Sequence, residues 1–397
     1  MPPLLKIEEG APPVGKGFAL FALGFRPFYL LASAFAALSI PLWALQFSGL
    51  LPHAYLAGPV WHAHEMLFGF TLAVIVGFLF TAGRNWSNLP TPTGWPLAAL
   101  AALWVAARVL VLTPYAAAAA LANVAFPLAA AVALAVPFIK AGVRRNYFFI
   151  GLLVLLAGAS AVIHLSRLGI VAQAPVWLGQ QLALDIVLFI LAVMGGRVIV
   201  MFTNNGVPGA NATKQPAVEK LALGSLLALA ALDVLGLHGA ALIAVATVAC
   251  LAHAARWLLW RPWKTLGAPL VWVLHLAYLW VPVHLLLRAC GELGWVAPSL
   301  AVHALTVGAV GGLIIGMMVR TSRGHTGRPL RADRFETACF AMVLLAALVR
   351  VGVPLAAPAL TLHAVLASAA LWSGGFALFA VRYWPVLSRP RIDGRPG

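Results

Sequence analysis

The sequence predicts an all-α fold, a polytopic transmembrane bundle of about twelve helices with both termini in the cytoplasm. Of its 397 residues, 63% are hydrophobic and only 9% are charged, so little of the chain is suited to folding in water. A helix needs roughly 20 apolar residues to cross the hydrocarbon of a bilayer, and such runs follow one another along the chain. Strands are excluded, because these Ala- and Leu-rich runs lack the alternation of a membrane barrel.

The apolar runs predict twelve spans, separated by short breaks. In chain order they cover residues 28–50, 62–83, 94–113, 116–140, 147–169, 175–203, 217–236, 239–260, 268–290, 297–320, 333–354 and 357–386. The chain is therefore expected to have a cytoplasmic segment at 1–27, a transmembrane domain at 28–386 and a cytoplasmic tail at 387–397. No internal repeat is evident among the predicted spans.

The distribution of positive charge supports this topology, because positively charged loops stay on the cytoplasmic side. With both termini inside, the lysines and arginines, 26 in all, fall on the inner side with few exceptions. These exceptions are Arg108, Arg167, Arg288 and Arg350. The net charge of +16 is then explained by topology and by attraction to anionic membrane lipid. No nucleic-acid partner is needed to explain it.

Histidine is the dominant ionisable group inside the predicted spans. The topology places six histidines from five spans near the outer surface: His62, His64, His164, His284, His303 and His363. Neutral imidazole binds iron and copper, and histidines on separate helices can hold a haem. These residues therefore predict at least one metal or haem site, although a single intramembrane histidine more often forms an interhelical hydrogen bond.

The densest group of polar residues is the segment WHAHEM at residues 61–66. His62 and Glu65 are three residues apart and share a helix face, whereas His64 is expected to point elsewhere. Glu65 could orient an imidazole or carry protons to a reduced substrate. Alternatively, the helix dipole favours an acid at this N-terminal position, and that alone would account for Glu65.

Two further polar residues are candidates for the site. Asp185, near mid-membrane in span 175–203, is either a proton-path residue or one half of a buried pair. Arg288, four residues after His284, either binds a haem propionate or extends its charged end to the membrane surface. By contrast, His253 is expected to be structural, and the three cysteines are expected to be small buried hydrophobes.

Four motifs resemble the NnrS family of bacterial membrane proteins over about residues 17 to 385. They are GFRPFYLL at 24–31, WHAHEMLFGFTLAVIVGFLFTAGRNWSNLPTPTGWP at 61–96, GGRVIVMFTNNGV at 195–207 and HALTVGAVGGLIIGMMVRTSRGHTGRPL at 303–330. The resemblance implies a multi-pass protein of the bacterial cytoplasmic membrane. It also implies association with haem, of b type, and copper, and a role in the response to nitric oxide and nitrosative stress.

The resemblance and the depth argument together give the expected ligands. His62, His64 and His303 stand in the matching motifs and are the first choices, whereas His164, His284 and His363 come from depth alone. Three functions follow as alternatives. The first is binding or reduction of nitric oxide, with electrons from quinol or a cytochrome and protons through Glu65 and Asp185. The second is transport of metal or haem, and the third is a haem-based sensor or assembly protein without turnover.

Overall fold

The computed structural model describes residues 17–47, 49, 54–171 and 175–395, and in this part of the chain every regular element is a helix. Ten helical segments here are long and apolar enough to cross a membrane. The other two predicted spans also form helices, but α4 (Gly94–Leu110) has only 17 residues. The other, α8 (Pro216–Val234), contains Glu219, Lys220 and Asp233. The expectation of an all-helical membrane bundle is confirmed, and by length and composition ten of the twelve spans qualify.

The helices follow one another with short connections. The α-helices are α1 (Phe25–Phe47), α2 (Gly58–His64), α3 (Leu72–Ser87), α4, α5 (Ala116–Lys140), α6 (Phe148–Arg167), α7 (Val176–Gly206), α8, α9 (Ala240–Leu259), α10 (Pro269–Tyr278), α11 (Trp280–Glu292), α12 (Pro298–His303), α13 (Gly312–His325), α14 (Arg334–Ala347), α15 (Val353–Ala356) and α16 (Thr361–Ser388). The π-helices are η1 (Glu65–Thr71), η4 (Ala304–Gly311) and η5 (Leu348–Gly352), and the 3-10 helices are η2 (Arg144–Asn146), η3 (Pro262–Lys264) and η6 (Pro358–Leu360).

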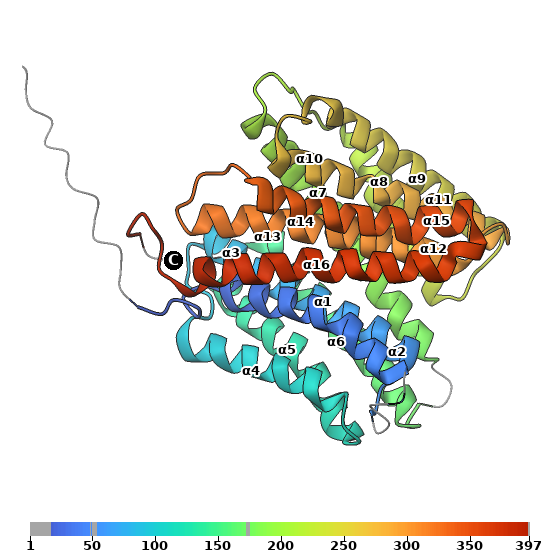
Figure 1. The fold of residues 1–397 in the computed structure, drawn as a ribbon, viewed down its shortest axis with the longest axis horizontal. Helices are drawn as coiled ribbons and strands as arrows, with labels where there is room; N and C mark the ends of the chain where they lie inside the picture. Colours follow the sequence, from blue (N-terminus) through green and yellow to red (C-terminus); the bar gives the residue numbers. More distant parts are fainter. Residues whose placement is uncertain (1–16, 48, 50–53, 172–174, 396–397) are drawn as a thin grey trace, which may run out of the picture.

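The helices lie side by side with their axes roughly along the longest dimension of the molecule (Figure 1). The short helices α2, α12 and α15 lie at one end of the bundle, and the C-terminus lies at the other. We call the first of these the histidine end, because it contains His64, His164, His284 and His303. The sequence predicts that this end faces outward.

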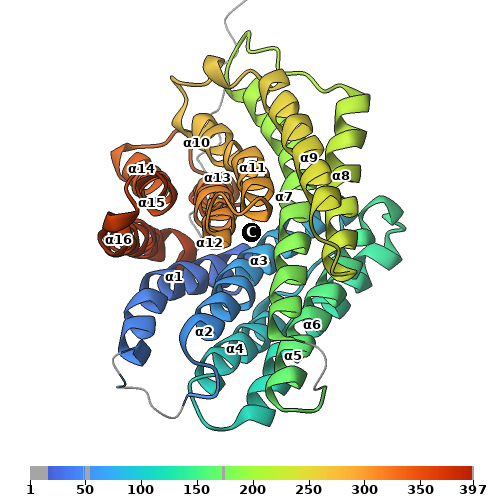
Figure 2. The same cartoon turned by 90° about the vertical axis from the view of Figure 1, so that its right-hand side faces the viewer.

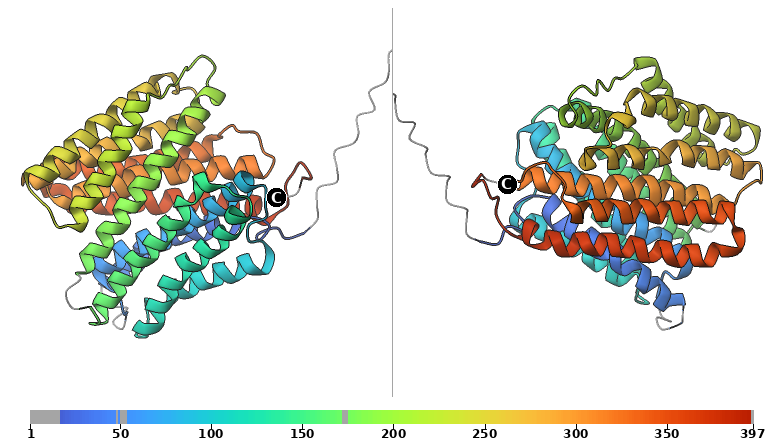
Figure 3. Two further views of the ribbon diagram at one scale, coloured as in Figure 1. Left: turned by 180° about the vertical axis from the view of Figure 1, so that it is seen from behind. Right: turned by 45° about the horizontal axis from the view of Figure 1, so that its top comes forward.

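Three helices form the centre of the bundle. Seen along the helices, α3, α7 and α13 lie near the middle, with the other helices around them (Figure 2). From behind, the long α7 runs along the boundary between the earlier helices, in blue to cyan, and the later ones, in yellow to orange (Figure 3). The spans that contain these three helices are the longest of the mostly buried ones, so they supply the core against which the outer helices pack.

Two of the central spans share an internal pattern that was not evident from the sequence. In one, His64 is followed at once by the π-helix η1, and in the other His303 is followed at once by η4. Gly69 and Gly308 are separated by the same number of residues as His64 and His303, and so are Gly77 and Gly316. Each of these four glycines allows a close approach, because a Cβ atom there would come within 3 Å of a neighbouring side chain. The two spans are therefore a structural repeat.

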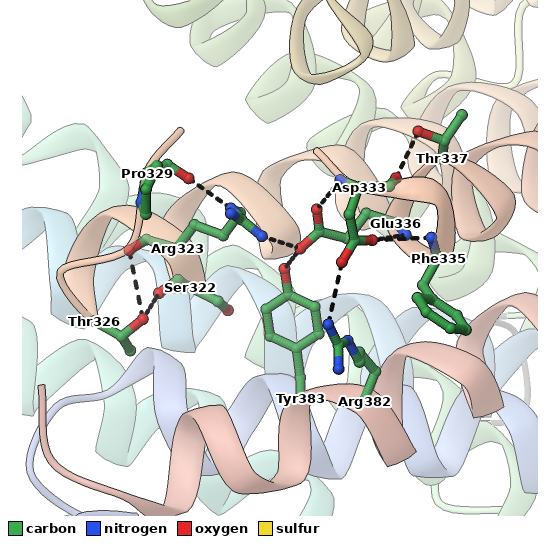
Figure 4. Close-up of polar contacts among 10 residues, drawn as sticks. All are labelled: Ser322, Arg323, Thr326, Pro329, Asp333, Phe335, Glu336, Thr337, Arg382 and Tyr383. Atoms are coloured by element: carbon green, nitrogen blue, oxygen red, sulfur yellow. Dashed lines mark hydrogen bonds and ion pairs between the residues drawn. The ribbon is translucent and has the colours of Figure 1, made fainter. Parts of the chain in front are cut away.

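An ion-pair network lies toward the end of the bundle opposite the histidine end (Figure 4). Asp333 caps α14 and forms a reciprocal capping box with Glu336. Arg323 donates to Glu336 over 2.8 Å, and the hydroxyl of Tyr383 also donates to this carboxylate. Arg382 donates to Asp333 over 3.1 Å. These contacts join the central helix α13 to α14 and α16.

Candidate functional site

Two buried histidines meet at the histidine end. His64 is the last residue of α2 and His164 lies near the end of α6, and both side chains are almost completely inaccessible to solvent. Their ring centres are 5.0 Å apart and their planes are inclined by 75°. Of the six histidines predicted to share one layer, this pair, joining two predicted spans, is the one whose rings are in direct contact.

Each of the two imidazoles is held through one ring nitrogen. Nδ1 of His64 lies 2.8 Å from Oε1 of Glu65, and Nδ1 of His164 lies 3.2 Å from the hydroxyl of Tyr55. Nε2 of each ring is buried and has no hydrogen-bond partner among the described residues. Metal-binding histidines are commonly oriented by a hydrogen bond to the other ring nitrogen. Each ring therefore has one nitrogen that is oriented by a supporting group and one buried nitrogen that is available to a ligand.

A buried ion pair supports His64 from the next span. Arg108 of α4 donates to Oε1 of Glu65 over 2.8 Å and also to the side-chain oxygen of Asn123. The side chain of Arg108 packs against Gly69, which leaves room for it because glycine has no side chain. A Cβ atom at Gly69 would lie 2.7 Å from Nη1 of Arg108. Glu65 thus accepts from a guanidinium and an imidazole at once, and its charge balances that of Arg108.

The structure corrects the expected orientation of the WHAHEM segment. The expectation was that His62 would share a face with Glu65 and that His64 would point elsewhere. Instead Glu65 contacts His64, because α2 ends at His64 and Glu65 begins the π-helix η1. The wider turn changes the angle between successive side chains, so the spacing rule of an α-helix does not apply here.

A second cluster contains His62 and His303. The ring of His62 stacks on Trp43 with 4.7 Å between ring centres, and its Nδ1 is buried without a hydrogen-bond partner among the described residues. His303 lies 2.6 Å from the carbonyl oxygen of Ser299 through Nδ1, and Arg350 approaches its Nε2 to 3.3 Å. With Nδ1 donating to the carbonyl, Nε2 of His303 accepts from the guanidinium.

A third cluster contains the acids of α7 and α8. Arg288 donates to both oxygens of Asp233, over 2.9 and 2.6 Å, and lies 3.7 Å from Asp185. Gln181 donates to Asp185 over 3.0 Å and to Asp233 over 3.3 Å. Asp185 is therefore part of a buried ionic group, one of the two alternatives considered. The guanidinium of Arg288 faces these carboxylates, a pairing that was not among the two roles expected for it, a haem propionate ligand or a side chain extended to the membrane surface.

The remaining predicted ligands lie apart from these clusters. His284 is buried, and its Nδ1 lies 2.8 Å from the carbonyl oxygen of Ala301. His363 is exposed near the start of α16. The structure therefore divides the predicted layer of six histidines into one contacting pair, one cluster with Arg350, and two separate residues.

His253 has the structural role expected for it. Its Nδ1 lies 2.7 Å from the hydroxyl of Tyr278 and its Nε2 lies 3.1 Å from the carbonyl oxygen of Ala222, so both ring nitrogens are occupied. Arg256 also donates to the hydroxyl of Tyr278 and forms a bidentate pair with Glu219. This network joins α7, α8, α9 and α10 away from the histidine pair.

The donor set at the histidine pair fits a metal ion held by two protein ligands. Among the described residues no group of three or more His, Cys, Asp or Glu is placed to hold a metal. A cavity of about 90 Å³ lies between the central spans, lined by apolar side chains that include Val74, Met194 and Leu313, and none of the six predicted histidines lines it.

The arginine, asparagine and tyrosine of the site were not predicted as functional residues. Arg108 was noted only as an exception to the charge rule, and Asn123 and Tyr55 carried no signal at all.

The resemblance noted in the sequence is tested directly by comparison with known families. The family model described as NnrS protein matches residues 19–391. No curated protein matches the chain. Because the match covers nearly the whole length, the chain belongs to the NnrS family.

Proposed function

We propose that this NnrS-family membrane protein holds a copper ion between His64 and His164 and binds nitric oxide there. The observation that supports this most is the pair of buried Nε2 atoms without hydrogen-bond partners in the described structure, on rings whose centres are 5.0 Å apart. Burying a polar group without a partner is costly. A metal ion bound to both nitrogens removes that cost at once.

The rings are close enough for one metal ion to bind both. Metal–nitrogen bonds are about 2.0 Å long, so two nitrogens on one metal are at most roughly 4 Å apart. Rings whose centres are 5.0 Å apart would allow this, and imidazole is a good ligand for copper. The haem implied by the family remains a prediction.

Nitric oxide suits a metal site of this kind, because the molecule is small, uncharged and soluble in lipid. Bound copper would supply the electron exchange with nitric oxide. Reduction of two nitric oxide molecules to nitrous oxide and water consumes two electrons and two protons. A quinol or a cytochrome would donate the electrons, and Glu65, whose carboxylate touches His64, would be the nearest side chain to pass a proton. The proposed location is the bacterial cytoplasmic membrane.

Metal analysis of the purified protein tests this proposal. We expect about one copper per chain, a reduced form that is silent in electron paramagnetic resonance, and an oxidised form with imidazole nitrogen couplings. Nitric oxide added to the reduced protein should change the X-ray absorption edge. Protein from copper-replete cells that contains no copper, and takes none up as Cu(I), would overturn the proposal.

A second candidate function is transport of a metal. It is favoured by the structural repeat between the spans of His64 and His303, because many transporters are built from internal repeats around a central site. Uptake of copper by sealed vesicles, lost in His64→Ala, would support transport. Binding of nitric oxide without uptake would favour the first function.

A further inference from the structure

The two repeated spans differ at one position that matters for charge. His64 in the first corresponds to His303 in the second, and in each the histidine ends an α-helix and a π-helix follows. The next residue is Glu65 in the first span but Ala304 in the second. The following predicted span carries an arginine near the same end in both cases, Arg108 and Arg350. The second copy therefore keeps the histidine and the arginine and lacks the carboxylate.

The missing carboxylate leaves a positive charge without a counterion. Arg108 is paired with Glu65 at 2.8 Å. Arg350 has no carboxylate within 4 Å in the part of the chain that the structure describes, and its side-chain contact there is with His303. Arg350 is only partly exposed, and a charge that is partly withdrawn from water is costly without a counterion. An anion bound beside Arg350 would restore the balance that Glu65 provides in the first copy.

The surroundings of Arg350 have the features of a binding site. Nδ1 of His62 is buried without a hydrogen-bond partner among the described residues, and His62 is near enough to Arg350 for the two side chains to interact electrostatically. Trp43 stacks on the His62 ring. Arg350 itself lies in the π-helix η5. Of the three π-helices in the described chain, η1 begins directly after His64, η4 begins directly after His303, and η5 contains Arg350. Such helices often mark functional sites.

We propose that Arg350, oriented by its contact with His303, and His62 bind a small planar oxyanion, such as nitrite or formate, in the place that the Glu65 carboxylate occupies in the first copy. A guanidinium presents parallel N–H groups that match two coplanar oxygens. Nδ1 of His62 would donate a further hydrogen bond. This site goes beyond the proposed copper function, because it uses no metal ligand from the His64 and His164 pair.

A lipid phosphate could supply the same negative charge, so the test separates the two sources. Nitrite and formate binding is measured by calorimetry on copper-free protein in a phosphate-free, lipid-free detergent. Phosphatidylglycerol is then added in a second titration. We expect nitrite and formate to bind without lipid. The proposal is overturned if neither anion binds, or if only phosphatidylglycerol does.

Matched variants assign the binding to this cluster. Arg350→Gln should weaken nitrite binding by tenfold or more, whereas Arg167→Gln, at an exposed arginine, should leave it unchanged. Ala304→Glu should abolish binding by supplying the carboxylate internally, and Ala304→Gln controls for the size of the new side chain. Equal affinity in Arg350→Gln and the wild type would overturn the proposal. Copper content in these variants tests the metal site separately, since a loss of anion binding alone leaves the copper proposal intact.

Discussion

The imidazole rings of His64 and His164 are in contact although they come from helices in different parts of the first half of the chain. Each ring is fixed by a different group, Glu65 for one and Tyr55 for the other. Glu65 directly follows His64 in the chain, and Tyr55 comes shortly before α2, so the segment around α2 supplies both supporting groups. Ligands held in this way would bind an ion without reorganising the surrounding helices.

The first prediction concerns the two proposed ligands. His64→Ala and His164→Ala should each lose most of the bound copper, because a single imidazole in this pocket leaves the ion with one protein ligand. His363→Ala is the matched control, since His363 is exposed and apart from the pair. Copper is measured by mass spectrometry of the purified proteins. Full copper content in both ligand variants would contradict the prediction.

The second prediction concerns the group that orients His164. Tyr55→Phe removes the hydroxyl that lies 3.2 Å from Nδ1 of His164. Loss of such a supporting hydrogen bond typically lowers metal affinity by about 10- to 100-fold. Competition with a Cu(I) chelator measures the change. Tyr115→Phe, at an exposed tyrosine, should bind copper as the wild type does, and an equal loss in that control would show that the effect is not local.

The third prediction concerns the buried pair behind His64. Glu65→Gln leaves the guanidinium of Arg108 buried without its counterion, and breaking one side of such a pair costs about 3–5 kcal/mol. The melting temperature in detergent should therefore fall. The double variant Glu65→Gln with Arg108→Met should regain much of this stability, because no charge is left unpaired. A double variant that is no more stable than Glu65→Gln would contradict this account.

The helical membrane fold could be predicted from sequence because most of the spans are continuous apolar runs. Hydropathy depends on composition over roughly 20 residues, so it tolerates local irregularity. It is less decisive for α8, where Glu219, Lys220 and Asp233 fall within one helix. Asp233 there is balanced by Arg288 of α11, a contact between distant segments that no local measure of hydropathy contains.

The site was predicted only in part, and the reason lies in the π-helices. The sequence identified His64, His164 and Glu65, but it paired Glu65 with His62 by the spacing of a regular α-helix. The π-helix begins at Glu65 and contains Gly69, against which Arg108 of another span packs, and such a contact between spans is not visible in the local sequence. Depth alone could not tell that His164 would meet His64 while His363 would not.

The fourth prediction is a pH effect on the C-terminal segment outside the spans. Arg391 hydrogen-bonds Asp393 over 2.8 and 2.6 Å and lowers the pKa of Asp393 from 3.8 to about 2. This contact therefore stabilises the folded segment above about pH 4 and is lost as the pH falls through about 2. The segment is also held by the N–H of Ile392, which donates to the carbonyl oxygen of Thr326.

Electron paramagnetic resonance of a spin label at Arg395→Cys measures this effect. The label should be immobile from neutral pH down to about pH 4 and become mobile between about pH 4 and pH 2. Asp393→Asn in the same background should be mobile at neutral pH. A transition near pH 6 instead would contradict the assignment to Asp393.

The fifth prediction concerns the unequal charge of the acid cluster. Arg288 is the one cation within 4 Å of Asp185 and Asp233 among the described residues, so one guanidinium faces two carboxylates. Arg288→Gln should lower stability by about 3–5 kcal/mol, because it leaves both acids without a counterion. Asp185→Asn removes the excess negative charge and keeps the hydrogen bond from Gln181, so it should be neutral or stabilising. Thermal unfolding in detergent at pH 7 measures both, and a larger loss in Asp185→Asn than in Arg288→Gln would show that both carboxylates are needed as charges.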